Sequence, residues 1–443
     1  MQHLFRMVSH PRASVLRLLQ RLVFWGSAVL VALAAILFAQ TSAAGGHLFQ
    51  SIVTAHPLLA FIITPGSLAG VVWLTRRVFA GAEGSGIPQT IAALKIHALA
   101  ERQSVLSLRL AFGKILMTSL ALCGGASVGR EGPTVQVGAA IMHSLGRWMR
   151  LPNREMEHGL ILAGGAAGIS AAFNTPLAGI VFAIEELSKS FEDRTSGTVL
   201  TAVIVAGLTS MAILGNYNYF GRTAVALELS NAWWPVLLCG VTGGVLGGWF
   251  ARLLLAFSHG IPGRPGALMK AHPVLFALLC GLGLAVLGYA TDSTVYGTGY
   301  EEARGLLEGR NDLPVTFGLM KFGATLLSYI SGIPGGIFAP SLSVGAGLGA
   351  TLSKLLPGTP VAALVILGMV GYFIGVVQAP ITAVVIVVEM TSDQSLTLPM
   401  MSVALIAFAV SKLVCPQPLY RTLAQYFLEK SVRRKPRPEQ EAP

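Results

Sequence analysis

Long stretches without a single charged residue are the feature that most limits what this chain can fold into. Residues 22–75 contain no Asp, Glu, Lys or Arg. Charged residues make up only 12% of the chain, against roughly 25% in soluble domains, so a soluble fold would lack polar surface. A spanning helix needs about 20 apolar residues. We expect an all-α polytopic membrane protein with about ten to twelve crossings. Further uncharged windows lie at 159–184, 229–251, 271–291, 322–353 and 355–388.

Basic residues gather at the two ends of the chain, which carries a net charge of +11. They flank apolar segments, as cytoplasmic residues of membrane proteins do, and therefore do not indicate a nucleic-acid partner. We expect a cytoplasmic basic N-terminus at 1–21, a transmembrane domain at 22–428 and a short cytoplasmic basic tail at 429–443. The apolar run 22–39 is read as an uncleaved first span and not as a signal peptide.

The chain also repeats itself. GREGPTVQVGA at 129–139 resembles GIFAPSLSVGA at 336–346, with glycines and prolines in register. A repeat of about 200 residues in a membrane protein is typical of transporters and channels with two pseudo-symmetric halves. We expect one half at about 22–215 and the other at about 232–428. Pairs separated by 204 to 207 residues are Gly129 with Gly336, Pro133 with Pro340, Gly138 with Gly345, Lys114 with Lys321, Pro176 with Pro380, and Glu185 with Glu389.

Two motifs in the first half have the composition of an anion site at a helix N-terminus. GSGIP at 84–88 has glycines that let the backbone approach a ligand, and Ser85 adds a hydroxyl. GREGP at 129–133 contains a carboxylate, Glu131, where backbone amides favour negative charge. An ionised Glu131 is thus a tethered anion that competes with a diffusible one. The alternative is that Glu131 only caps its helix; an acid between apolar segments favours the gate.

The second half carries GGIFAP at 335–340, in which Ile337 and Phe338 replace the charged pair. Two opposed helix N-termini favour an anion, because a cation site would need carbonyl or carboxylate rings. Lys114 and Lys321 lie in apolar segments, where each needs a partner. They either pair with a carboxylate or raise the positive potential of the pathway, and the residues alone do not separate these roles.

Other polar residues are less informative on their own. Glu185 and Glu186 end an apolar segment and read as a solvated acid pair; Tyr420 reads as an interfacial aromatic. The four cysteines and nine histidines show no metal-ligand spacing, so we expect no metal, no cofactor and no enzymatic activity.

Together the motifs make the chain resemble the CLC family of chloride channels and proton-coupled chloride antiporters, over residues 20–428. GSGIP, GREGP and GGIFAP are that family's three anion-pathway motifs and occur here in order. The resemblance implies a homodimer with one pathway per subunit, each subunit having about 18 helices, many of them short or tilted, in two inverted-topology repeats. The short cytoplasmic ends fit a prokaryotic member in the inner (plasma) membrane.

The resemblance also implies roles for individual residues. Ser85 and Tyr420 would donate hydroxyls to a central chloride, together with the amides of Ile337 and Phe338. Glu131 would be the gate that moves aside when it is protonated.

The outer anion site would be formed by the backbone of Gly129, Arg130 and Gly132. Glu186 matches the family's inner proton-transfer glutamate, which overturns its reading as a solvated acid and favours antiport. We therefore expect a chloride/proton antiporter, with a passive chloride channel of the same fold as the alternative.

Overall fold

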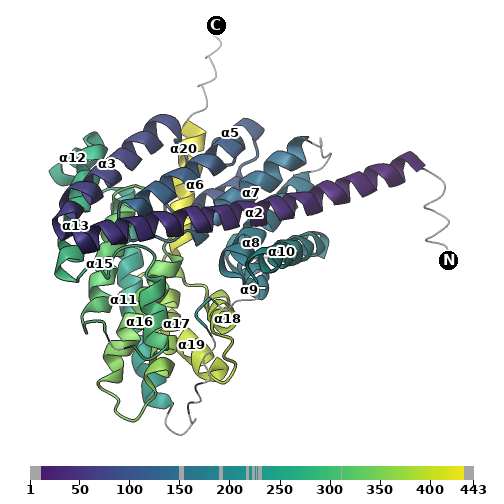
Figure 1. Ribbon diagram of the computed structural model, residues 1–443. Coiled ribbons are helices and arrows are strands. Elements are labelled where there is room, and N and C mark those ends of the chain that lie inside the picture. The colour runs from purple at the N-terminus through teal and green to yellow at the C-terminus, as the bar shows by residue number, and fades with distance from the viewer. Residues whose placement is uncertain are drawn as a thin grey trace.

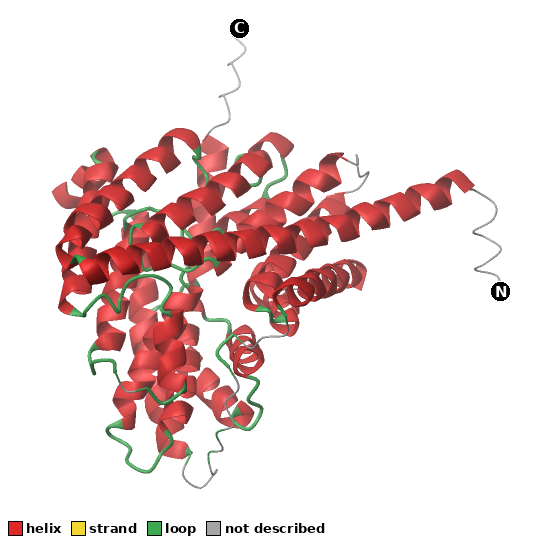
Figure 2. Ribbon diagram, viewed as in Figure 1, coloured by secondary structure: helices red, strands yellow, loops and turns green. Residues whose placement is uncertain are grey.

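The computed structural model describes residues 11–148, 154–188, 193–215, 219–221, 225, 227, 232–310 and 312–433. Within these residues the chain is helical, and no strand of a sheet is formed (Figure 2), as the all-α expectation requires. The ends of the two basic terminal segments, 1–10 and 434–443, lie outside the described residues.

The helical segments, in chain order, are α2 (Pro11–Ala55), η1 (Pro57–Leu59), α3 (Ala60–Val78), α4 (Ile87–Lys95), α5 (Leu99–Gln103), α6 (Leu108–Cys123), α7 (Glu131–Trp148), α8 (Arg154–Phe173), α9 (Pro176–Phe182), η2 (Ala183–Ser188), α10 (Asp193–Leu214), α11 (Trp233–His259), α12 (Arg264–Ala271), α13 (Pro273–Ala290), α14 (Tyr300–Leu307), α15 (Phe317–Ile330), α16 (Phe338–Ser353), α17 (Val361–Val377), α18 (Pro380–Thr391), α19 (Thr397–Val414) and α20 (Leu419–Arg433).

The apolar helices of the described chain differ in length. By length and composition, seven segments of the described chain are long and apolar enough to cross a membrane. The apolar helices α15, α17 and α18 are shorter, at 14, 17 and 12 residues. Such helices are tolerated at membrane depth where protein surrounds them, and every residue of α17 from Ala363 to Val377 is buried.

The helices of the second half pack as those of the first half do. Helix α2 contacts α8 and α10, and α11 contacts α17 and α19; α7 packs on α8 as α16 packs on α17. Helices α4 and α6 both contact α7, as α14 and α15 both contact α16. The repeat read from the sequence is therefore a repeat of structure.

Equivalent helices also meet one another where the halves join. Helix α3 packs on α13, α9 on α18, and α7 on α16, and the first two pairs lie side by side in Figure 1. Contacts between equivalent elements place a pseudo-two-fold axis between the halves.

Glycines set the distance between the central helices of each half. A methyl group at Gly138 of α7 would overlap the carbonyl oxygen of Gly164 in α8, and one at Gly345 of α16 would overlap Gly368 or Met369 in α17. Small residues let membrane helices approach backbone to backbone, so the glycines aligned in the two motifs hold equivalent helix pairs together.

We predict that Gly138→Ala destabilises the protein by about 1–3 kcal/mol, the usual cost of overpacking a tight interface. The matched control is Gly70→Ala in α3, where an added methyl group meets nothing within 4 Å and alanine favours the helix. Thermal unfolding in detergent measures both; equal midpoints for the two variants would contradict the packing argument.

Candidate functional site

The N-termini of α4, α7 and α16 converge at the junction of the two halves. A methyl group at Gly132, in the first turn of α7, would overlap the Ser85 hydroxyl and come within 3.5 Å of the Cα atom of Gly336. Gly86 caps α4 in the left-handed region, at φ 100°, a conformation that glycine adopts without strain. Three buried helix N-termini therefore lie around one small volume.

Backbone hydrogen bonds hold these loops against each other. Gly129 and Gly336 donate to one another's carbonyl oxygens at 2.7 and 2.6 Å. The Gly84 amide donates to Ile333 at 3.2 Å, and Gly335 returns a bond to Gly84 at 3.1 Å. The motifs of the two halves are thus joined directly, main chain to main chain.

The four predicted chloride-contacting residues come together here. Ser85, Ile337, Phe338 and Tyr420 are all buried, and the rings of Phe338 and Tyr420 have centroids 6.0 Å apart. Within the described chain, the hydroxyls of Ser85 and Tyr420 are buried without a hydrogen bond of normal geometry. The two hydroxyls lie within reach of each other, and a small anion beside them would accept from both.

Aromatic rings close the site around Phe338. Its ring centroid lies 4.8 Å from that of Phe373, 6.1 Å from Phe182 and 6.3 Å from Phe173. A wall of this kind excludes bulk water, so the amides and hydroxyls act in a medium of low dielectric constant, where electrostatic attraction is stronger.

Glu131 is the first residue of α7 and is completely buried. Its carboxylate lies near the backbone amides of Arg130 and Ala339, although neither oxygen makes a hydrogen bond of normal geometry in the described part of the chain. The carboxyl group thus lies across the ends of α7 and α16, where positive potential is highest. The structure keeps it within the set of amides that would hold an anion.

Glu186 lies near Tyr420 as well. It is 5% exposed, and both Glu186 and Glu131 are electrostatic neighbours of the Tyr420 hydroxyl. It belongs to η2, a π-helical turn that follows α9; such turns are frequent at functional sites. Of the acid pair, Glu186 is buried, whereas Glu185 is half-buried.

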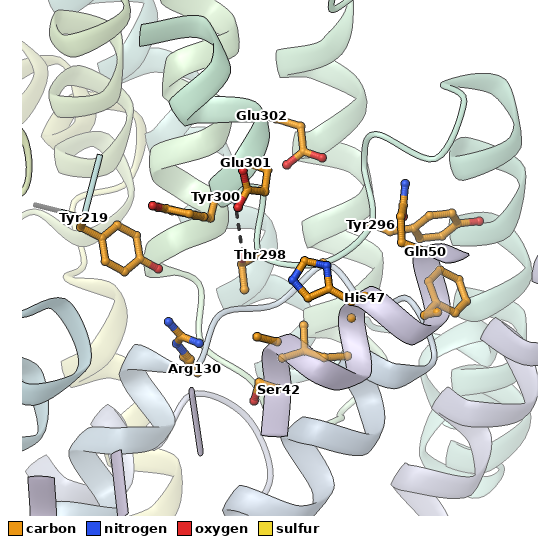
Figure 3. A pocket seen from close by; sticks show the side chains of 16 residues that line it. Ser42, His47, Gln50, Arg130, Tyr219, Tyr296, Thr298, Tyr300, Glu301 and Glu302 are labelled. Carbon is orange, nitrogen blue, oxygen red and sulfur yellow. Dashed lines mark hydrogen bonds between the residues drawn. The ribbon is translucent and has the colours of Figure 1, made fainter. Parts of the chain in front are cut away.

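Arg130 lies beside a cavity of about 440 Å³ between α2, the Gly129 loop and the segment before α14. Figure 3 shows Arg130 toward one end of it, Glu302 toward the other, and His47 of α2 between them. The Arg130 guanidinium donates to the Ala39 carbonyl oxygen at 2.9 Å. Arg130 thus lines this cavity, and the next residue in the chain is the buried Glu131.

The partner of Lys114 is a group of backbone carbonyls. Its ammonium donates to the oxygens of Ala82 at 2.6 Å and Gly84 at 2.8 Å. These carbonyls belong to the turn that ends in Ser85. Lys114 is fully buried, and it neutralises oxygens that would otherwise repel an anion at that turn.

Lys321 likewise donates to backbone carbonyl oxygens, in the second half. Its ammonium donates to the oxygens of Val295 and Gly297, both at 2.9 Å, and that turn contains Thr298 where the first half has Ser85. The two lysines are thus equivalent in contacts as well as in sequence. Each also has a nearby carboxylate, Glu83 for Lys114 and Glu302 for Lys321.

The sequence reading missed what Glu185 and Glu389 contact. Glu185 accepts from the amide of Thr382 at 2.6 Å, and Glu389 accepts from the amide of Ala178 at 2.6 Å. The signal was present, since the two glutamates were already matched in the repeat. Their partners were not deducible, because each lies about 200 residues away along the chain.

Within the residues the structure describes, no group of three or more His, Cys, Asp or Glu could hold a metal ion.

The sequence is similar to a family of known membrane transport proteins. The family model described as "Voltage gated chloride channel" matches residues 67–412. The H(+)/Cl(−) exchange transporter ClcA of Vibrio campbellii is 32% identical over 401 residues, covering 87% of this chain and 83% of that protein. ClcA of Klebsiella pneumoniae is also 32% identical, with 87% and 82% covered.

A solved structure described as a slow cyanobacterial Cl−/H+ antiporter superimposes with a TM-score of 0.77 at 25% identity. The match covers 92% of this chain and 98% of that one.

We predict that Lys114→Met weakens chloride binding by roughly tenfold, about 1.4 kcal/mol, because it leaves the carbonyls beside Ser85 without a positive partner. Lys321→Met is the control: it removes the same kind of contact from the equivalent turn, away from Ser85, and should leave affinity within about twofold. Isothermal titration with chloride measures both. Equal losses in the two variants would mean that the lysines act only through stability.

Proposed function

The chain belongs to the CLC family, that of the voltage-gated chloride channels, and on that premise we propose that it exchanges chloride for protons across a membrane. The observation that carries the proposal is the buried carboxylate of Glu131, which lies among the amides of two opposed helix ends. A protonatable anion in the place of a diffusible one links proton uptake to chloride movement.

We propose that chloride binds between the two halves without any cation in direct contact. The hydroxyls of Ser85 and Tyr420 and the amides of Ile337 and Phe338 would donate to it. Each helix N-terminus contributes roughly half of an elementary positive charge. The donors of the site therefore replace the water molecules that hydrate the ion. Because none of these donors carries a full charge, the ion can leave again, whereas a buried ion pair would hold it.

Glu131 acts as the gate in this proposal. When ionised, it occupies the amides of Gly129, Arg130 and Gly132 and competes with chloride. When protonated, it is neutral and no longer favoured there, so it moves aside and an anion takes its place. The cavity beside Arg130 would be the outer route by which both chloride and protons reach it.

Glu186 would carry the proton between Glu131 and the inner face. Its burial and its proximity to Tyr420 support this role. A passive chloride channel needs no second protonatable group on the inner side, and the named relatives are exchangers. Both points favour exchange over the channel alternative.

The protein is a membrane protein, and its finer placement is part of the proposal. We place it in the inner (plasma) membrane, with 22–428 as the membrane domain and the basic segments 1–21 and 429–443 in the cytoplasm. We also propose a homodimer with one pathway per subunit. Leu177 and Ile381, equivalent residues of α9 and α18, are each 61% exposed and offer an apolar patch with the self-complementarity that a two-fold dimer needs.

The proposed exchange is tested in proteoliposomes. An imposed chloride gradient should drive protons uphill, in the opposite direction to chloride, and a pH electrode and a chloride electrode read both fluxes together. Chloride movement without any pH response would reject exchange in favour of the channel.

Glu131→Gln and Glu186→Gln should each retain chloride flux and lose proton movement. The first replaces the gate with a neutral mimic of its protonated form, and the second interrupts the proton route without touching the anion route. Glu308→Gln is the control, because Glu308 is a surface carboxylate paired with Arg304 at 2.8 Å and should leave coupling intact. Uphill proton movement in either site variant would refute the role given to that residue.

A further inference from the structure

A glutamate of each half accepts hydrogen bonds from backbone amides of the other half. Glu185, at the end of the α9 segment, accepts from the amides of Ile381 at 3.2 Å and Thr382 at 2.6 Å. Glu389, near the end of α18, accepts from the amides of Leu177 at 3.1 Å and Ala178 at 2.6 Å. Each glutamate thus caps the first turn of the other half's helix, with equivalent partners and almost equal distances.

Proline explains why these amides need a partner. Helices α9 and α18 begin at Pro176 and Pro380, which have no N–H group. The next two amides of each helix are the first donors, and they have no acceptor within the helix. A carboxylate accepts both at once, and its charge also favours the helix N-terminus.

The two caps are equivalent in contact but differ in what lies next to them. Glu389 is followed by Met390, a buried apolar residue, whereas Glu185 is followed by Glu186. Glu185 and Glu186 share the π-helical turn η2, which has only the seven-residue helix α9 before it. A short turn of this type depends on tertiary contacts for its shape.

We propose that Glu185 is a positioning residue for proton transfer: by capping α18 it anchors η2 to the second half and so keeps Glu186 directed at the site. The inference rests on the proposed exchange function and adds a residue to it. Glu185 itself carries neither the proton nor the anion. Its bonds to Ile381 and Thr382 determine where the neighbouring carboxylate points.

The test compares the symmetry-related variants Glu185→Gln and Glu389→Gln. The amide side chain retains one acceptor oxygen, so each variant loses one of two bonds at its helix end. In proteoliposomes, Glu185→Gln should keep chloride flux but lower the ratio of protons to chloride by about half or more. Glu389→Gln should keep the wild-type ratio. Both ratios are measured on monodisperse protein, so that misfolded protein does not contribute to either flux.

Two further variants complete the test. Glu185→Ala removes both bonds and should lower the ratio further. The double variant Glu185→Gln with Glu186→Gln should have the same ratio of protons to chloride as Glu186→Gln alone, because both substitutions act on one proton route. An unchanged ratio in Glu185→Gln and Glu185→Ala, or equal falls in the Glu185 and Glu389 variants, would overturn the positioning role. If the wild-type protein moves chloride without protons, the exchange function itself fails, which is a different outcome.

Discussion

The paired hydrogen bonds between the backbones of Gly129 and Gly336 join equivalent residues of the two halves, and the geometry of the site follows from them. They fix the loops that precede α7 and α16, so these two helices start at the same point and present their amides to each other. The contact leaves little room for larger residues, since a methyl group at Gly129 would crowd Pro340 and one at Gly336 would crowd Pro133. Glycine at both positions is therefore a condition for bringing the helix ends together.

The positive potential of the candidate site comes from partial charges on polar groups. Helix ends, hydroxyls and amides supply many weak attractions, whereas the two buried ammonium groups are each taken up by carbonyl oxygens. Lys114 holds the turn that bears Ser85, and Lys321 holds the equivalent turn that bears Thr298. A site of this kind can bind an ion and release it, because no single interaction dominates. In the proposed exchange, the same balance would let a carboxylate on the chain, Glu131, take the place of a free ion.

Much of this could be predicted from the sequence because glycine and proline mark loops and helix starts. The motifs at 84–88, 129–133 and 335–340 do lie at the junction, and Tyr420 joins them there. The partners of Lys114 and Lys321 could not be predicted, since carbonyl oxygens occur at every residue and carry no sequence signal. The caps made by Glu185 and Glu389 depend on how α9 and α18 meet. The division of the apolar segments into long and short helices could not be predicted either, because apolar composition does not distinguish a helix surrounded by protein, such as α17, from one surrounded by lipid.

The reciprocal Gly129 and Gly336 contact also bears on ancestry. An interface in which each residue meets its own equivalent is what a dimer of identical chains forms. The present chain has the architecture of such a dimer, fused end to end. In an unfused ancestor every feature would have occurred twice, so an acid at position 131 would have faced a second acid at the position now held by Phe338. Fusion would remove that constraint, and in the proposed exchange one half could then carry the protonatable Glu131 while the other kept the apolar Phe338.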